Sequence, residues 1–261
     1  QAEKLIDRIG KQAHSFTTYG VSATILKANL DALATTGLPI YLTEMDIDGT
    51  TDYIQLKEFQ RVFPVFWKHP SVQGITLWGF RSGLWRTKEG AYLVNQNGTE
   101  RAALKWLKAY VNDTLVNTQS ITVLASDGST TISTKGASLN MLAQVLPVNT
   151  TIPNVNWTVS PTYMATIDAT GKLTALANGK VTVTATAWDA SGAKGTASIT
   201  ISNQTTGLSE KALADQISVY PNPAATRNFT IKGIENIKTI ELVNLLGEKV
   251  IGFDNLNQAD L

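Results

Sequence analysis

The sequence contains no cysteine and only two histidines, His14 and His69. Without cysteine, the chain has no disulfide scaffold, no thiol catalysis and no zinc site built on thiolates. Two histidines are too few for a metal centre that is made of several imidazoles. The composition therefore predicts no metal site.

The chain also has almost no excess of charge of either sign. Its 22 Lys and Arg nearly balance its 21 Asp and Glu, which leaves a net charge of +1. An electrostatic nucleic-acid binder would carry a basic face, so no nucleic-acid partner is expected. No apolar run approaches the roughly 18–20 residues of a membrane span, so no span is predicted. Apolar residues still make up 43% of the chain, which is enough for buried cores.

The length of 261 residues allows one large domain or two to three small ones. Residue 1 is Gln rather than an initiator Met, and no signal peptide follows it. Residues 255–261 run on directly from a strand-like segment. We expect the chain to be a piece of a longer, multidomain protein.

Residues 1–112 alternate short apolar runs with helical patterns. Strands are predicted over Leu5–Gln12, Leu38–Met45 and Ser71–Gly79, and helices over Ser22–Thr36, Asp52–Trp67 and Thr99–Val111. The second strand is mostly apolar, as in a strand that is buried on both faces. This order is typical of parallel β/α architecture and fits the last three units of a (β/α)₈ TIM barrel. An open doubly wound sheet is the alternative, although no Gly-rich phosphate loop follows any strand.

Residues whose side chains could take part in catalysis or sugar binding lie at the ends of these strands. In chain order they are Gln12 and His14, then Glu44 and Asp46, then Trp78 followed by Trp85 and Arg86. Catalytic residues of a barrel lie at the carboxyl ends of its strands. A carboxylate is the usual nucleophile of a retaining glycosidase, and Trp faces suit stacking on sugar rings. Each residue alone has a plainer explanation as a surface or core group, but their joint placement favours a glycosidase site.

Four short motifs resemble a known family. Ile9–His14 (IGKQAH), Thr43–Ile47 (TEMDI), Thr76–Phe80 (TLWGF) and Leu84–Arg86 (LWR) are similar to the last three strands of glycoside hydrolase family 10. That family comprises retaining endo-β-1,4-xylanases on a (β/α)₈ barrel. The resemblance covers residues 1–112.

The resemblance implies a role for each site residue. Glu44 would be the nucleophile, with His14 and Asp46 hydrogen-bonded around it. Gln12 would lie near the glycone sugar, and the sugar subsites would be lined by Trp78, Trp85 and Arg86. The family's acid/base Glu lies on an earlier strand that is absent from this sequence. The chain therefore holds half of a catalytic pair and is expected to be inactive by itself.

Residues 119–203 form a second module, after a predicted polar hinge at Asp113–Thr118. They contain no Arg, no Glu, many Thr and alternating strands, which predicts a small β-sandwich. This module resembles a bacterial Ig-like domain of group 2, and the resemblance is carried by Val155–Thr158, Ala165–Ala175 and Gly179–Ala187. We favour a spacer, and the alternative is a carbohydrate-binding module with Trp188 or Tyr163 as its platform.

Residues 216–261 begin a third module of β-sandwich type, after a predicted polar linker at Gln204–Ala214. Strands are predicted at 217–220, 229–232, 239–244 and 249–253. Ile217–Ala224 and Ile240–Val250 resemble the C-terminal sorting domain of type IX secretion, here incomplete. The resemblance implies the type IX secretion machinery as a partner. It also implies a secreted or cell-surface location in a Bacteroidetes-type bacterium.

Two functions of different classes stay open. The first is the C-terminal part of a secreted family 10 xylanase that hydrolyses xylan or a related β-1,4-linked polysaccharide. It needs no cofactor, because its chemistry uses carboxylates alone. The second is a non-catalytic polysaccharide-binding or cell-surface protein with a degenerate barrel segment. An Asn-Glu pair at the end of a preceding strand in the upstream gene would favour the enzyme.

Overall fold

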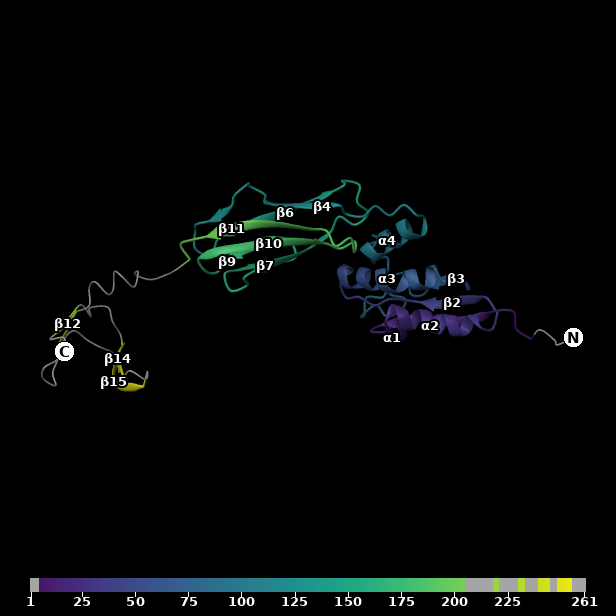
Figure 1. The fold of residues 1–261 in the computed structure, drawn as a ribbon, viewed down its shortest axis with the longest axis horizontal. Coiled ribbons are helices and arrows are strands. Elements are labelled where there is room, and N and C mark those ends of the chain that lie inside the picture. The colour runs from purple at the N-terminus through teal and green to yellow at the C-terminus, as the bar shows by residue number, and fades with distance from the viewer. Residues whose placement is uncertain (1–4, 205–217, 221–229, 233–238, 245–247, 255–261) are drawn as a thin grey trace. The chain divides into compact units, whose positions relative to one another are not determined.

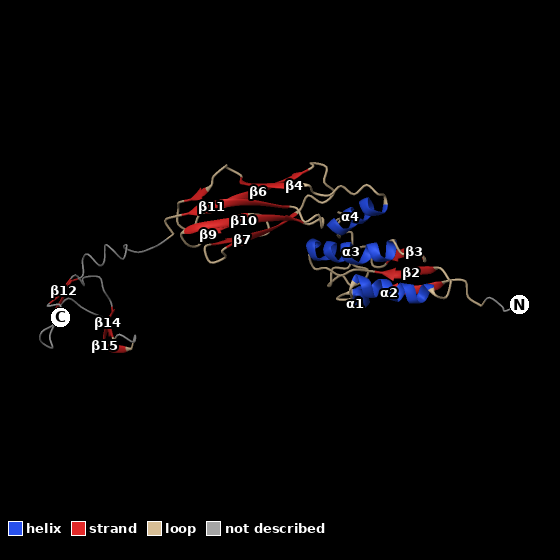
Figure 2. Cartoon of the chain, viewed as in Figure 1, coloured by secondary structure: helices blue, strands red, loops and turns tan. Residues whose placement is uncertain are grey.

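A computed structural model describes residues 5–204, 218–220, 230–232, 239–244 and 248–254 (Figure 1). The chain divides into two compact units, Gln1–Gln204 and Thr205–Leu261. The first unit holds an α/β segment and then a module made of strands, as the colouring by secondary structure shows (Figure 2). All candidate site residues lie in the α/β segment.

Strands and helices alternate through the α/β segment, as predicted. Their order is β1 (Ile9–Ala13), α1 (Ser15–Thr18), α2 (Ala23–Ala34), β2 (Ile40–Met45), α3 (Asp52–Trp67), β3 (Val72–Leu77) and α4 (Ala102–Val111). The three strands form one parallel sheet in the order β1-β2-β3. Their carboxyl ends therefore meet at one edge of the sheet.

Local signals explain where the long helices begin. The Ser22 hydroxyl accepts a hydrogen bond from Ile25 N at 3.2 Å and caps α2. The Thr51 hydroxyl caps α3 in the same way, from Ile54 N at 3.3 Å. Helix α3 has the predicted bounds, and it buries the apolar residues Leu56, Phe59, Val62, Phe63 and Phe66. These side chains belong to the core that also holds the inner face of the sheet.

The first strand is shorter than predicted. It begins at Ile9 rather than at Leu5. Leu5 and Ile6 are 86% and 64% exposed, and the exposed ion pair between Asp7 and Arg8 separates them from the strand. Two apolar residues beside such a pair are too short a run to define a strand without a packing partner.

The second strand is buried on one face, whereas its apolar run predicted burial on both. Ile40 and Leu42 are fully buried against the helices. Tyr41 is half-buried and Thr43 is exposed. An apolar run shows that a strand packs on something, but it does not show how many of its faces are covered in a given chain.

The strand module confirms the predicted β-sandwich. One sheet has the order β4-β6-β9-β8 and the other the order β5-β11-β10-β7. The bounds are β4 (Ser120–Ala125), β5 (Thr131–Ile132), β6 (Ser138–Leu146), β7 (Val155–Ser160), β8 (Ala165–Ile167), β9 (Lys172–Ala175), β10 (Gly179–Ala187) and β11 (Lys194–Ile201). One buried core joins the two sheets, with Val123, Leu173, Val183 and Ile199 among its members.

The segment Asp113–Thr118 is not the hinge that its polarity predicts. Thr151 N donates to Val116 O at 2.9 Å, and Val116 N donates to Thr151 Oγ1 at 2.9 Å. Thr118 N donates to the carboxylate of Asp189. These bonds fasten the segment to loops of the strand module. Polar composition alone could not reveal this, because the bonds come from residues far away in sequence.

The strand module also packs on helix α3. Ile152 is 1% exposed and belongs to the core of the α/β segment. The Trp188 ring lies 5.3 Å from the Tyr53 ring, and Gln60 Nε2 donates to Trp188 O at 3.2 Å. Trp188 is therefore an interface residue rather than an exposed platform, whereas Tyr163 is 69% exposed.

Asp189 gives this junction a pH dependence. Burial raises the pKa of its carboxyl group, but hydrogen bonds from Ser191 and Thr118 outweigh burial, so the pKa lies below its ordinary value. The stabilisation is therefore complete above about pH 4 and is lost as the pH falls through the lowered pKa. We expect Asp189→Asn to cost about 1 kcal/mol of unfolding free energy at pH 7 and less than that at pH 3. Urea unfolding at both pH values tests this, and an equal cost at both would contradict it.

The second unit contains two antiparallel strand pairs. They are β12 (Ser218–Tyr220) with β13 (Thr230–Lys232), and β14 (Thr239–Val243) with β15 (Lys249–Asp254). These strands agree with the predicted ones, but the linker 205–214 and the segment 221–223 lie outside the described residues. A sandwich in this unit stays a prediction. Among the helices that the structure describes, none has the length and apolarity to cross a membrane.

Candidate active site

The parallel register of β1 and β2 brings the first two site residues together. Gln12 stands opposite Glu44 in the register. Gln12 Nε2 donates to Glu44 Oε1 at 2.9 Å. The Glu44 side chain is 25% exposed, so its carboxylate is reachable from solvent while one oxygen is held from the neighbouring strand.

His14 and Asp46 continue the same two chain segments by two residues. His14 Nε2 lies 3.1 Å from Glu44 Oε2, and His14 Nδ1 contacts Asp46 Oδ2. Both imidazole nitrogens therefore face carboxylate oxygens. His14 and Asp46 are 5% and 2% exposed. The structure thus brings the three predicted catalytic residues into one hydrogen-bonded row.

Asp46 accepts two further hydrogen bonds. Ser15 N donates to its Oδ1 at 3.0 Å, and Trp85 Nε1 donates to its Oδ2 at 2.9 Å. The Trp85 ring also lies 5.6 Å from the His14 ring. The contacts with Ser15, Trp85 and His14 hold the buried Asp46 carboxylate in one orientation.

Trp78 and Arg86 lie in the loop that follows β3. Trp78 is 42% exposed, and its N donates to Met45 O at 2.8 Å. Arg86 has a φ of +43°, which is rare outside glycine. Its Nε and Nη2 donate to Asp48 at 2.9 and 2.6 Å. The guanidinium predicted to line a sugar subsite is thus engaged in an ion pair along that edge.

Sequence reasoning missed Asp48 and Phe16 at this edge. Phe16 is 60% exposed and stacks on His14 at 5.0 Å, with Arg86 5.6 Å from its ring centroid. Asp48 could have been found from the sequence, because it follows Asp46 by two residues after the strand. Nothing in the sequence pattern marks Phe16.

Two buried polar side chains join the loops that follow β2 and β3. Gln55 Nε2 donates to Ile47 O at 3.1 Å and to Gly90 O at 2.9 Å. Arg101 donates from Nη1 to Gly90 O at 2.6 Å and from Nη2 to Gly49 O at 2.8 Å. Both side chains are almost completely buried. They fix the loop that carries Trp85 against the loop that carries Asp46 and Asp48.

Gly90 tests how closely these loops must approach. Its φ is +71°, and a Cβ there would lie 2.3 Å from Gly49 O. We expect Gly90→Ala to lower the unfolding free energy by more than about 3 kcal/mol, because the φ cost and the backbone clash add. Gly98 has a φ of +83° with nothing within 4 Å of the added carbon. Gly98→Ala should therefore cost only about 1–2 kcal/mol. Equal losses of unfolding free energy in Gly90→Ala and Gly98→Ala, measured by urea unfolding, would contradict the close approach of Gly90 to Gly49 O.

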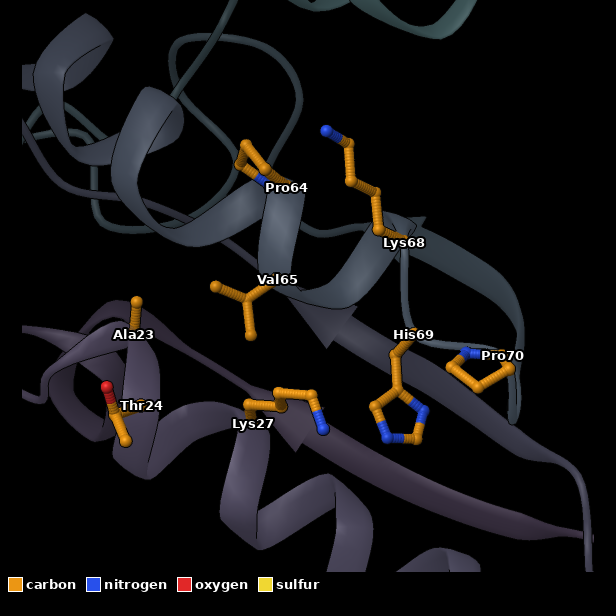
Figure 3. Close-up of a pocket in the computed structure, with 8 residues that line it drawn as sticks. All are labelled: Ala23, Thr24, Lys27, Pro64, Val65, Lys68, His69 and Pro70. Atoms are coloured by element: carbon orange, nitrogen blue, oxygen red, sulfur yellow. The ribbon is translucent and has the colours of Figure 1, made fainter.

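A pocket between α2 and α3 holds none of the predicted site residues. It has a volume of about 370 Å³ and is lined by Ala23, Thr24, Lys27, Pro64, Val65, Lys68, His69 and Pro70. Figure 3 shows Lys27 extending toward His69. Hydrogen bonds from Lys27 and then from His69 hold the pKa of Asp31 below its ordinary value. Within the described ranges, no group of three or more His, Asp or Glu is arranged to hold a metal ion.

Comparison with known proteins places two families on the chain. Residues 1–110 match the family model for glycosyl hydrolase family 10, and residues 117–198 match that for the bacterial Ig-like domain (group 2). Endo-1,4-beta-xylanase B of Cellvibrio japonicus is 47% identical over 104 residues, which are 39% of this chain and 17% of that protein. Endo-1,4-beta-xylanase 2 of Arabidopsis thaliana is 36% identical over 97 residues, 37% of this chain and 9% of that protein.

Among solved structures, native xylanase 10B from Thermotoga maritima aligns with a TM-score of 0.35 and 24% identity. The alignment covers 41% of this chain and 37% of that one. The chain spans 17% or less of the length of the two curated relatives named above. The α/β segment is thus similar to glycosyl hydrolase family 10 over residues 1–110, and the strand module, here called the Ig-like domain, is similar to bacterial Ig-like domains of group 2 over residues 117–198.

Proposed function

We propose that this chain is part of a retaining endo-β-1,4-xylanase in which Glu44 is the nucleophile. The observation that carries the proposal is the row of hydrogen bonds from Gln12 to Glu44 to His14 to Asp46 at the carboxyl edge of a parallel sheet. Two relatives that match this chain over 104 and 97 residues are named endo-1,4-beta-xylanases. The substrate class is xylan or a related β-1,4-linked polysaccharide.

The chemistry asks two things of Glu44. One oxygen must attack the anomeric carbon, so that a carbon–oxygen bond to Glu44 forms while the bond to the leaving sugar breaks. The carboxylate must also be ionised and aimed. Gln12 and His14 each hold one of its oxygens, and partial exposure leaves it open to a sugar. In the second step water attacks the same carbon and releases Glu44.

The acid/base is a separate carboxyl group. It gives its proton to the leaving oxygen and later takes a proton from the attacking water, and it stands about 5–5.5 Å from the nucleophile. Asp46 is unsuited to this role, because it is buried and its oxygens accept from Ser15, His14 and Trp85. We assign the acid/base to a segment outside this sequence, and we expect the 261-residue chain to release no reducing sugar from xylan.

The same bonds define the supporting roles. His14 and Asp46 are positioning residues for Glu44. Trp78 and Trp85 are the sugar-stacking residues, and the hydrogen bond from Trp85 to Asp46 sets the orientation of its ring. Arg86 acts through its pair with Asp48, which holds the loop behind Trp85.

Covalent trapping tests the proposal in the parent enzyme, the longer protein that supplies the acid/base. A 2-fluoro xylobioside with a good leaving group should form a stable glycosyl-enzyme, and peptide mapping should place the label on Glu44. A label on a residue outside Thr43–Asp46 would refute the assignment. Inversion of the anomeric centre, followed by NMR, would refute the retaining mechanism.

We further propose that residues 216–261 are a type IX sorting domain that sends the protein to the cell surface or outside the cell. The Ig-like domain ends later than predicted, since Gln204 N donates to Asn178 Oδ1 and Gln204 Oε1 accepts from Gly136 N, both at 2.8 Å. Truncation after Gln204 should therefore leave the catalytic rate of the parent unchanged and abolish surface delivery. Activity assays test the expected catalytic rate, and cell fractionation tests the expected loss of surface delivery. Loss of activity in the purified truncated parent would show that residues 205–261 do more than address it.

A further inference from the structure

One exposed aromatic residue is left unexplained by the site at the carboxyl edge. Trp67, the last residue of α3, is 48% exposed, whereas Phe59, Phe63 and Phe66 of the same helix are at most 3% exposed. It forms one wall of a groove of about 390 Å³ that is also lined by Lys68, Tyr110, Val111, Asp113 and Leu115. We propose that this groove is a second glycan-binding site, which takes a short stretch of a neutral β-1,4-linked polysaccharide.

The walls of the groove are built before any ligand arrives. The Trp67 ring stacks on Phe63 at 5.6 Å, and the Tyr110 ring stacks on Trp106 at 4.7 Å. Tyr110 also meets Phe63 edge-on at 6.0 Å. Rings held by other rings lose little conformational freedom when a ligand binds, which favours affinity.

The polar groups of the groove suit a neutral ligand rich in hydroxyl groups. Lys68 brings a positive charge and Asp113 a negative one, so their formal charges cancel. The Lys68 Nζ lies 5.8 Å from the centre of the Tyr110 ring. A pyranose offers apolar C–H faces to aromatic rings and hydroxyl groups to such polar neighbours.

The size of the groove favours a sugar chain over a protein. Small-molecule sites span roughly 300–1,000 Å³, whereas a stable protein interface needs about 800 Å² on each partner. The pocket in Figure 3 is of similar volume, but no Trp, Tyr or Phe lines it. The aromatic groove is therefore the better candidate for stacking on a sugar.

The topology sets this groove apart from Glu44. Glu44 lies near the carboxyl end of β2, and α3 then returns the chain to the amino end of β3. Trp67 therefore lies at the edge of the sheet opposite to the catalytic one. A long polysaccharide held at both edges gains affinity through effective concentration. The choice of glycan rests on the proposed function, but the presence of a site does not.

Binding of xylohexaose to the 261-residue chain with Glu44→Gln tests the inference. The Trp67 indole N–H signal, assigned by its loss in Trp67→Phe, should shift on titration. Trp67→Ala should raise the dissociation constant of this site at least tenfold, and Trp67→Phe should raise it less. Leu142→Ala is the matched control, because it removes an apolar side chain of the Ig-like domain that is 47% exposed, nearly as much as Trp67, and it should change binding less than twofold. Circular dichroism checks that each variant is folded.

Unchanged affinity in folded Trp67→Ala would overturn the inference. So would loss of all binding in Trp78→Ala, which would place xylohexaose at the catalytic edge alone and leave the proposed function intact. Conversely, binding that depends on Trp67 in a protein whose Glu44 is never labelled would retain the groove and remove the proposed reaction. Binding of xylohexaose and of an unrelated α-linked glucan with equal affinity would overturn the β-1,4 assignment.

Discussion

Glu44→Gln in the parent enzyme should abolish turnover of xylan, with a loss of kcat of about 10⁴-fold or more. The substitution keeps the shape of the side chain and one carbonyl oxygen, but an amide cannot form the ester bond to the anomeric carbon. The Gln12 amide that now donates to Glu44 Oε1 can still donate to the amide oxygen. Steady-state rates and equilibrium binding of xylo-oligosaccharides, measured on the same preparation, separate lost chemistry from lost binding.

The control for this variant is Asp46→Asn. Asp46 touches Glu44 only through His14, so its replacement should lower kcat much less than Glu44→Gln does. Binding by Trp78 and Trp85 should persist in Glu44→Gln. Full activity of Glu44→Gln, or a larger loss in Asp46→Asn than in Glu44→Gln, would contradict the assigned roles.

Ile152→Ala should lower the unfolding free energy by about 2–5 kcal/mol, the range for a buried aliphatic side chain cut back to Ala. Ile152 lies in a loop of the Ig-like domain but is 1% exposed within the core of the α/β segment. The substitution should therefore destabilise both the Ig-like domain and the α/β segment. Hydrogen exchange should show faster opening of amides in α3, although the substitution is in the other domain.

Val148→Ala is the matched control for Ile152→Ala. Val148 lies four residues away in the same loop and is 90% exposed, so its truncation should change stability by less than about 0.5 kcal/mol. If the Ig-like domain were a loosely tethered spacer, Ile152 would face solvent and both variants would be silent. Unchanged exchange in α3 of Ile152→Ala would show that the two segments do not share a core.

The parts of the fold that sequence could predict are those with local causes. Helix α3 has capping by Thr51 and an apolar stripe within sixteen residues, and its bounds were predicted without error. The site row could also be predicted, because Gln12, His14, Glu44 and Asp46 all follow from strand ends in a parallel sheet.

The parts that sequence could not predict depend on distant residues. The polar segment Asp113–Thr118 looked like a hinge, and only its bonds to Thr151 and Asp189 make it fixed. Trp188 was a candidate platform only in the alternative to a spacer, and the sequence did not indicate its ring contact with Tyr53 of α3. The clamp by Arg101 crosses from α4 to two loops, a relation that no periodicity records.

The shared core of α3 and the Ig-like domain limits how these segments can be recombined by gene fusion. A domain joined by a free tether can be moved from one enzyme to another without regard to its neighbour. Here a transplanted α/β segment would expose the ring of Tyr53 and the amide of Gln60, and a transplanted Ig-like domain would expose Ile152 and Trp188. The two segments therefore have to be moved together, and chimeras joined at Asp113–Thr118 are expected to need compensating substitutions on both sides of the junction.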